Sequence, residues 1–222
     1  CEREKFQNPV AFSSDLKLRI WESSQRNASL ETIMKKFKDS LSSKPQWDKA
    51  NVILDPDTAH PELIVSADRR SVRWGDTRQA VPNNPERFDT ARCVLGCEGF
   101  TSGSHYWEVE GEREGGVFCY VGVARESVSR KGRINYSPEQ GIWTVQCWED
   151  QCWALTSPRQ IIPFPPSRGP HRIRVYLDYE RGLVAFFDAG TGDPIVTFPP
   201  ASFAGERIRP FFWVGVVTVR LL

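Results

Sequence analysis

Hydrophobic and polar residues alternate with a period of two along most of the chain after Pro45. The alternating runs are short, and Gly, Pro and Asn turns separate them, which is typical of strands in a sandwich or barrel. Without a strand-helix-strand rhythm or an internal repeat, the pattern predicts an all-β, two-sheet antiparallel β-sandwich. The predicted strands are Asn51 to Leu54, Glu62 to Ser66, Ser71 to Trp74, Cys93 to Cys97, His105 to Glu110, Val117 to Ala124, Gly141 to Trp148, Cys152 to Thr156, His171 to Asp178, Leu183 to Asp188, Ile195 to Phe198 and Arg209 to Val219.

One predicted strand carries two tryptophans on opposite faces. Alternation divides it into two sets, Trp143, Val145 and Cys147 against Thr144, Gln146 and Trp148. We assign the first set to the core, together with Trp107, and the second to the surface. An exposed tryptophan beside amide and hydroxyl groups suits an interface anchor. The other interpretation of Trp148 is a lid over the domain's own loops.

The first 45 residues follow a different pattern. A stripe of apolar residues at helical spacing predicts an amphipathic helix formed by Leu30, Ile33, Met34, Phe37 and Leu41. Such a stripe needs a partner, which is either the following domain or a coiled-coil region that continues upstream. We therefore divide the chain into a helical extension at 1–45 and one domain at 46–222.

Composition limits the classes of partner. The chain has 222 residues, 40% hydrophobic and 26% charged, which fits one soluble domain with a short extension. Its net charge of +1 gives no electrostatic attraction to nucleic acid, and no apolar run is long enough to insert into a membrane. The chain starts at Cys1 without a signal-peptide pattern, which suggests a piece of a longer cytoplasmic protein.

The six cysteines predict neither a metal site nor a disulfide framework. Cys93, Cys119 and Cys147 fall within apolar runs, where a free thiol behaves as a small buried hydrophobe. The spacings from Cys93 to Cys97 and from Cys147 to Cys152 lack the close pairs and histidines of a structural zinc site. We expect free thiols, a reducing compartment, and no metal or cofactor.

Catalytic patterns are weak. Glu108 and Glu110 lie two residues apart on a predicted strand, a spacing compatible with paired-carboxylate glycoside hydrolysis, but two surface carboxylates more often pair with arginines. His60, His105 and His171 are far apart and accompany no nucleophile motif. The chain also lacks the Cys/His zinc array of a RING-type ligase. We predict that this chain is not an enzyme.

Three ordered motifs carry a family resemblance. Leu54-Asp55-Pro56, Trp107-Glu108-Val109-Glu110 and Leu177-Asp178-Tyr179-Glu180 resemble the PRY-SPRY domain of butyrophilins and tripartite-motif proteins, over about residues 46–222. The resemblance implies a concanavalin-like jelly roll whose partner-binding face combines variable loops with a concave sheet. In tripartite-motif ubiquitin ligases such a domain follows a coiled coil. The helical stripe therefore favours a tripartite-motif parent, dimerised through that coiled coil, over a butyrophilin.

The resemblance also implies a ligand-binding site. Carried over position by position, it comprises Thr90, Ala91, Arg92, Cys93, Tyr120, Tyr136, Gln146, Trp148, Phe212 and Trp213. Arg92 either binds a ligand carboxylate or is simply solvated. Ala91 departs from the cationic or histidine contacts of phosphate-binding butyrophilins, and Trp213 is bulkier than usual. The resulting hypothesis is a module that binds a protein or peptide target for a ubiquitin ligase, with a butyrophilin-like sensor of a phosphorylated metabolite as the alternative.

Overall fold

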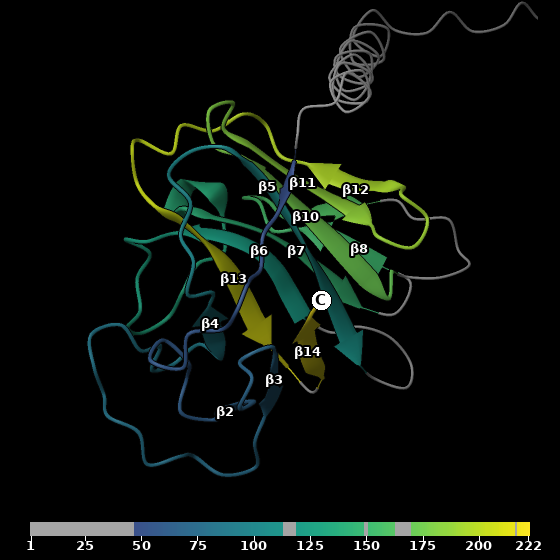
Figure 1. Ribbon diagram of the computed structural model, residues 1–222. Helices are drawn as coiled ribbons and strands as arrows, with labels where there is room; N and C mark the ends of the chain where they lie inside the picture. Colours follow the sequence, from purple (N-terminus) through teal and green to yellow (C-terminus); the bar gives the residue numbers. More distant parts are fainter. Residues whose placement is uncertain (1–46, 113–118, 149–150, 163–169, 216) are drawn as a thin grey trace, which may run out of the picture. The chain divides into compact units, whose positions relative to one another are not determined.

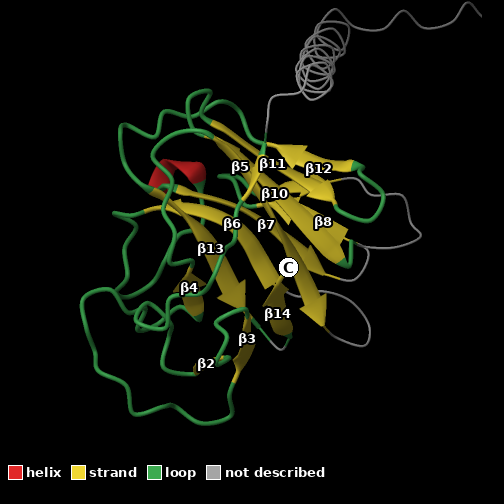
Figure 2. Ribbon diagram, viewed as in Figure 1, coloured by secondary structure: helices red, strands yellow, loops and turns green. Residues whose placement is uncertain are grey.

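The computed structural model describes residues 47–112, 119–148, 151–162, 170–215 and 217–222. The chain divides into two compact units, Cys1–Pro45 and Gln46–Leu222. The predicted helix at Leu30 to Leu41 lies outside the described residues, so it stays a prediction. The described residues of the larger unit form strands, loops and one short 3₁₀ turn, η1 (Pro138–Gln140), as Figure 2 shows.

The first sheet contains eight strands. Their order is β12-β11-β10-β5-β14-β3-β2, with β1 beside β5 in the only parallel pairing among the described strands (Figure 1). The strands span β1 (Asp48–Lys49), β2 (Leu63–Val65), β3 (Ser71–Trp74), β5 (Ser104–Glu112), β10 (Arg172–Asp178), β11 (Leu183–Asp188), β12 (Pro194–Thr197) and β14 (Thr218–Leu221).

The second sheet contains six strands in the order β4-β13-β6-β7-β8-β9, all antiparallel. They span β4 (Cys93–Leu95), β6 (Cys119–Arg125), β7 (Ile142–Trp148), β8 (Gln151–Ala154), β9 (Gln160–Ile162) and β13 (Ile208–Val214). The two sheets confirm the predicted all-β sandwich.

The main core lies between the sheets, and both sheets contribute side chains to it. Trp107 and Trp143 are 1% and 2% exposed, which confirms the prediction for these two tryptophans. Val145 and Cys147 accompany Trp143 on the core face of β7, as alternation predicted. The inward face of this strand therefore follows from its sequence alone.

A second, smaller apolar cluster covers part of the outer face of the six-stranded sheet. Strand residues contribute Cys93, Leu95, Ala124, Ile142 and Phe211, and loop residues contribute Phe88 and Val128, with Ile134 and Tyr136 packed against them. Loops therefore cover this part of the outer face. The strands continue beyond it, and the candidate site lies along that border.

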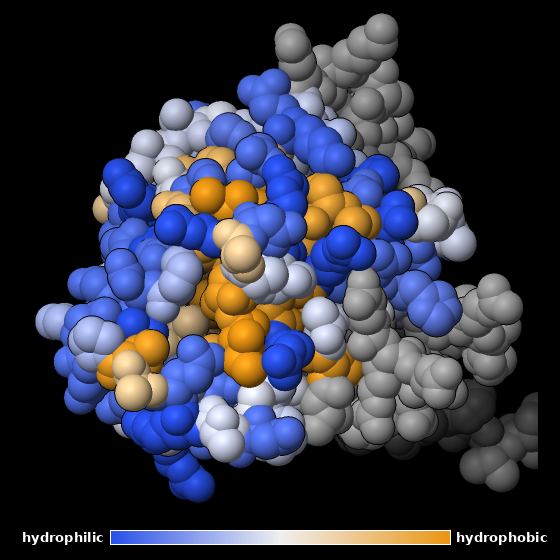
Figure 3. All heavy atoms as spheres, turned by 60° about the horizontal axis from the view of Figure 1, so that its bottom comes forward, coloured by the Kyte–Doolittle hydropathy of each residue, from blue (hydrophilic) through white to orange (hydrophobic). Residues whose placement is uncertain are grey.

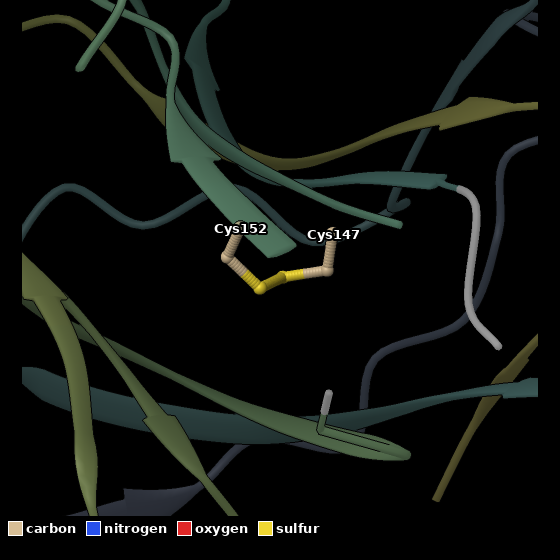
Figure 4. Close-up of a disulfide and its surroundings, with 2 residues drawn as sticks. All are labelled: Cys147 and Cys152. Carbon is tan, nitrogen blue, oxygen red and sulfur yellow. A yellow bond between two sulfur atoms is a disulfide. The ribbon is translucent and has the colours of Figure 1, made fainter. Parts of the chain in front are cut away.

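The expectation of free thiols is wrong for Cys147 and Cys152. Cys147 forms a disulfide with Cys152, which stands directly opposite it across the β7–β8 pair with a Cα–Cα distance of 4.1 Å (Figure 4). Sequence spacing did not reveal that the hairpin brings the two cysteines face to face. Cys93 is free and buried, as predicted, and Cys97 is free and half-buried. The disulfide removes the basis for inferring a reducing compartment from the cysteines.

Most predicted strands occur within one or two residues of their predicted bounds, with a few differences. The segment from Arg209 to Val219 forms two strands, β13 and β14, which belong to different sheets. The segment from Asn51 to Leu54 forms only a single bridge, between Leu54 and Gly96. Strands β1 and β9 were not predicted, because each is a short run stabilised by its neighbour and not by its own pattern.

Candidate functional site

A row of paired residues crosses the outer face of the six-stranded sheet. The strand register joins Trp213 to Tyr120, Tyr120 to Gln146, Gln146 to Trp153 and Trp153 to Ile161. Residues paired across neighbouring strands project to the same face. Their sequence neighbours Phe212, Val121, Val145 and Cys152 lie in the main core. We call the five outward residues the outer row: Trp213, Tyr120, Gln146, Trp153 and Ile161.

A pocket of about 420 Å³ lies at the β13 end of the outer row. Its lining comes from the loop before β4, the loop before η1 and strand β13, and consists of Thr90, Ala91, Arg92, Arg133, Ile134, Tyr136 and Trp213. Five of these seven residues belong to the predicted site. Aromatic and apolar walls with a few polar groups are typical of a binding pocket.

Aromatic stacking holds the floor of this region. The rings of Tyr120 and Trp213 are stacked with centroids 4.7 Å apart, and Tyr136 meets Tyr120 edge to face at 5.1 Å. Burial raises the pKa of Tyr120, while the charge and hydrogen bond of Arg159 act against that rise. Burial likewise raises the pKa of Tyr136. Both phenols are therefore neutral at physiological pH.

Arg92 is held in place by two neighbours. Its Nε donates to Glu62 at 3.2 Å, and its guanidinium lies 4.5 Å from the centroid of the Trp74 ring. The Nε1 of Trp74 donates to the same Glu62 oxygen at 3.3 Å. That hydrogen bond, with the Arg92 and His60 charges, lowers the pKa of Glu62. Within the described residues the ion pair uses only Nε, so the fork nitrogens of Arg92 can still bind an anion.

Two predicted site residues are not accessible. Cys93 and Phe212 are both fully buried, at 0% exposure. Successive residues of a strand point to opposite faces, so Phe212 faces the core because Trp213, the next residue, faces outward. The prediction that Phe212 and Trp213 both belong to the binding surface is therefore wrong for Phe212. Cys93 faces outward, but Tyr136 covers it, with the phenolic oxygen 3.8 Å from its sulfur. Burial raises the pKa of this thiol, which makes it unreactive.

The outward assignment of Gln146 is right in direction but wrong in exposure. Gln146 belongs to the outer row, yet only 8% of it is exposed, and Thr144 is fully buried. The Oε1 of Gln146 has no hydrogen-bond partner within the described part of the chain. The side chain of Trp148 lies outside the described residues. Its role as an anchor or a lid therefore stays a prediction.

Sequence reasoning missed several residues of this face. Arg133 and Ile134 line the pocket, Trp153 and Ile161 extend the outer row, and Arg159 contacts Tyr120. Ile161 is the large hydrophobic residue that stands out among those described, with 73% of it exposed. Alternation in Gln151 to Ala154 could have placed Trp153 outward. Arg133 and Arg159 lie on loops, where no periodic pattern in the sequence indicates which way a side chain points.

The alternative chemistry has ordinary structural explanations. Glu108 pairs with Arg174 at 2.5 Å and with Arg172 at 3.7 Å, and Glu110 pairs with Arg172 at 3.7 Å. His60 bonds to the Asp89 carbonyl and accepts from the backbone of Glu62. Among the described residues no group of three or more His, Cys, Asp or Glu could hold a metal ion. In that same part of the chain, no helix combines the length and apolar character needed to span a bilayer.

One face of the molecule combines hydrophobic and hydrophilic residues. Figure 3 shows a face on which hydrophobic residues gather at the centre and hydrophilic residues surround them. An apolar centre with a polar rim is the general arrangement of protein-binding surfaces.

Family models match most of the larger unit. The SPRY-associated domain PRY matches residues 52–100, and the SPRY domain matches residues 104–221. Mouse butyrophilin subfamily 2 member A2 is 50% identical over 166 residues, which are 75% of this chain and 31% of that protein. The pig E3 ubiquitin-protein ligase TRIM15 is 42% identical over 214 residues, which are 96% of this chain and 46% of that protein. The chain thus spans about a third to a half of the length of these relatives.

Solved structures agree on the fold. The TRIM65 PSpry domain matches with a TM-score of 0.67 and 22% identity over 79% of this chain and 90% of that chain. Stonustoxin matches with a TM-score of 0.67 and 26% identity over 78% of this chain and 29% of that chain. The chain therefore belongs to the SPRY family, as a SPRY domain preceded by its PRY segment, with butyrophilins and tripartite-motif proteins among its relatives.

Proposed function

We propose that this chain is the substrate-recognition module of a tripartite-motif ubiquitin ligase and binds a protein or peptide at the pocket beside Trp213. SPRY domains are binding modules, so the chemistry of ubiquitin transfer would belong to other parts of a longer protein. The observation that carries the proposal is the pocket of about 420 Å³, where the aromatic floor meets Arg92 of the predicted site and Arg133.

The extent of similarity supports a tripartite-motif parent. The matches to pig TRIM15 and to bovine tripartite motif-containing protein 10 each cover 214 of the 222 residues, so they extend well into the first 45. The matches to butyrophilins cover 74% to 79% of the chain. We propose that the helical stripe at Leu30 to Leu41 belongs to a dimerising coiled coil, and that the protein is cytoplasmic.

A peptide screen tests the binding proposal. A display library that samples internal segments and free C-termini is selected against the full chain, and the affinities of the selected peptides are measured for Trp213→Ala and Trp213→Phe. A central aromatic of an interface contributes about 2 kcal/mol or more, which corresponds to about thirtyfold in affinity. We expect Trp213→Ala to lose at least that factor and Trp213→Phe to retain most of the binding, because phenylalanine preserves stacking on Tyr120.

The thermal midpoints of both variants control for unfolding. Arg172→Gln serves as a matched surface control, since Arg172 lies on the other sheet and is 44% exposed. A folded Trp213→Ala protein with unchanged affinity would show that the ligand binds elsewhere.

A second candidate is a sensor of a small phosphorylated metabolite, and the specific observation in its favour is the pair Arg92 and Arg133 in the pocket lining. Titration calorimetry with organic phosphates separates the two functions. Binding heat that disappears in Arg92→Gln would support the sensor, whereas the absence of heat together with peptide binding would support the recognition module.

A further inference from the structure

We infer that the site extends beyond the pocket along the whole outer row and selects an extended peptide with a carboxylate at one end and an apolar side chain at the other. This inference rests on the proposed function. It adds the chemistry of the ligand and the spacing between its two recognised groups.

The first step is the length of the row. Trp213 and Ile161 are separated by four strand-to-strand steps, from β13 through β6, β7 and β8 to β9. At about 4.8 Å a step, the two ends lie about 19 Å apart. An extended peptide rises about 3.4 Å per residue, so two side chains about six positions apart in the peptide can reach both ends of the row. One residue of a ligand cannot reach both ends of the row, but a short peptide segment can.

The second step is the difference in chemistry between the two ends. Arg92 and Arg133 line the pocket at the Trp213 end. Arg159 belongs to the loop before β9, and its side chain interacts with Tyr120, the next residue of the row after Trp213. Within the described residues, Glu62 pairs with Arg92, and no carboxylate forms an ion pair with Arg133 or Arg159. Arginines beside an aromatic floor bind carboxylates well, because the planar fork donates two parallel hydrogen bonds.

The opposite end is apolar. Ile161 is 73% exposed at the end of the row, and the partly exposed Trp153 lies beside it on β8. An exposed isoleucine next to a tryptophan gives an apolar surface that a leucine or an aromatic side chain of the ligand can cover. The charge at one end and the apolar surface at the other define the polarity of the bound peptide.

The middle of the row contains an unused hydrogen-bond acceptor. Gln146 lies between Tyr120 and Trp153, and its Oε1 is buried without a partner. An unpaired buried acceptor costs about 1 to 3 kcal/mol. A small shift of the neighbouring rings would let a backbone N–H of the ligand donate to it. The row therefore has a central position suited to peptide backbone.

Fluorescence anisotropy with synthetic peptides tests the inference on the full chain. Labelled, C-terminally amidated peptides carry one Glu and one Leu separated by increasing numbers of Ser and Gly residues. We expect the tightest binding when the two groups are about six positions apart, because this even spacing matches the length of the row and places both side chains on the same face of the extended peptide. A parallel series with a free C-terminus in place of Glu distinguishes a side-chain carboxylate from a terminal one.

Substitutions assign each end. Replacing Glu by Gln in the peptide should weaken binding about tenfold, and so should Arg133→Gln in the protein. Both changes remove the same contact, so the two together should weaken binding by less than the product of the two single effects. Ile161→Ser should abolish the preference for Leu over Ser in the peptide. Arg172→Gln, on the other sheet, should change neither the affinity for the peptide nor its preference for Leu.

The outcomes separate this inference from the proposed function. If peptide binding requires Trp213 but does not depend on the Glu–Leu spacing, on Arg133 or on Ile161, the extended site is wrong. The proposal of a peptide-binding pocket beside Trp213 would then still stand. Absence of binding by every peptide, with pyrophosphate bound in a manner sensitive to Arg92, overturns both.

Discussion

Arg209 is a buried cation that connects the PRY segment to the SPRY strands. It donates to the Gly96 carbonyl at 2.6 and 2.8 Å, to Asp55 at 2.8 Å and to Glu126 at 3.0 Å, and only 7% of the residue is exposed. One planar guanidinium thus satisfies three acceptors that come from different parts of the chain. Among the amino acids, only arginine carries five N–H donors in one planar group.

Arg209→Met should lower the free energy of unfolding by about 3 kcal/mol, because it leaves the buried Gly96 carbonyl unpaired and removes the partner of two carboxylates. Urea denaturation measures the loss. Arg172→Met, at an exposed ion pair, should cost less than about 0.5 kcal/mol. Equal effects of the two substitutions would contradict the structural role of Arg209.

His60 makes the stability of the domain depend on pH. Burial lowers its pKa below the ordinary histidine value of 6.5 and outweighs the hydrogen bond to Asp89 and the charge of Glu62, which raise it. The charges of Arg78 and Arg92 lower it further. Neutral His60 donates to the Asp89 carbonyl and accepts from the Glu62 N–H. Since the folded pKa lies below the unfolded one, the stability contribution is complete above pH 6.5 and is lost as pH falls through the folded pKa.

We therefore expect wild type to lose more stability than His60→Gln when pH falls from roughly 7.5 to 5.5, since glutamine provides a donor and an acceptor without titrating. Urea midpoints at the two pH values give the comparison, and the shared carboxylates cancel in the difference. Parallel pH profiles of the two proteins would show that His60 does not titrate in this range.

At the scale of the element, the β7–β8 hairpin gains a covalent link. Cys147 and Cys152 are directly paired across the two strands and close a short loop. In the chain-entropy model, a loop of about six residues gives a disulfide contribution of about 2 kcal/mol. Because β7 and β8 carry Gln146 and Trp153, the same link restrains the middle of the outer row.

Cys147→Ser with Cys152→Ser should lower the unfolding free energy by about 2 kcal/mol in oxidising buffer, and reduction of wild type should have a similar effect. Peptide mapping without reduction detects the link directly. Cys97→Ser is the control, since that cysteine is free and half-buried. A reduced wild type that is as stable as the oxidised protein would contradict the contribution of the disulfide.

Periodicity predicted the strands whose own side chains define a face. Ser71–Trp74 and Leu183–Asp188 have the predicted bounds because each alternates or forms an apolar run between clear turns. β9 has three residues and depends on pairing with β8, so no local signal marks it. Alternation also gave the face of Gln146. It could not give the loops that cover part of that face, and for this reason Cys93 was wrongly assigned to the accessible site.

At the scale of the whole molecule, the PRY and SPRY segments form one folding unit. Val52, Leu54, Leu63 and Val72 from the PRY segment pack in the same core cluster as Val121, Val145 and Val175. Strand β3 pairs with β14, and β4 pairs with β13, so PRY strands complete both sheets. Neither segment contains a core of its own within the described residues, and both should therefore unfold together.

Hydrogen exchange measured by mass spectrometry on the full chain tests this cooperativity. Val72 is 1% exposed, and Val72→Ala should lower the free energy of unfolding by about 2 kcal/mol. If the unit is cooperative, the substitution should reduce protection equally in β3, where it lies, and in β6, in the other sheet, because the slowest amides of both strands exchange only through global unfolding. Val175→Ala, in the SPRY segment, should reduce protection in the same two strands.

A loss of protection confined to β2 and β3 would instead mean that the PRY segment opens independently. In that case ligand binding at Arg92 and Thr90, which belong to the PRY segment, would be coupled to a local order transition and not to a preformed pocket.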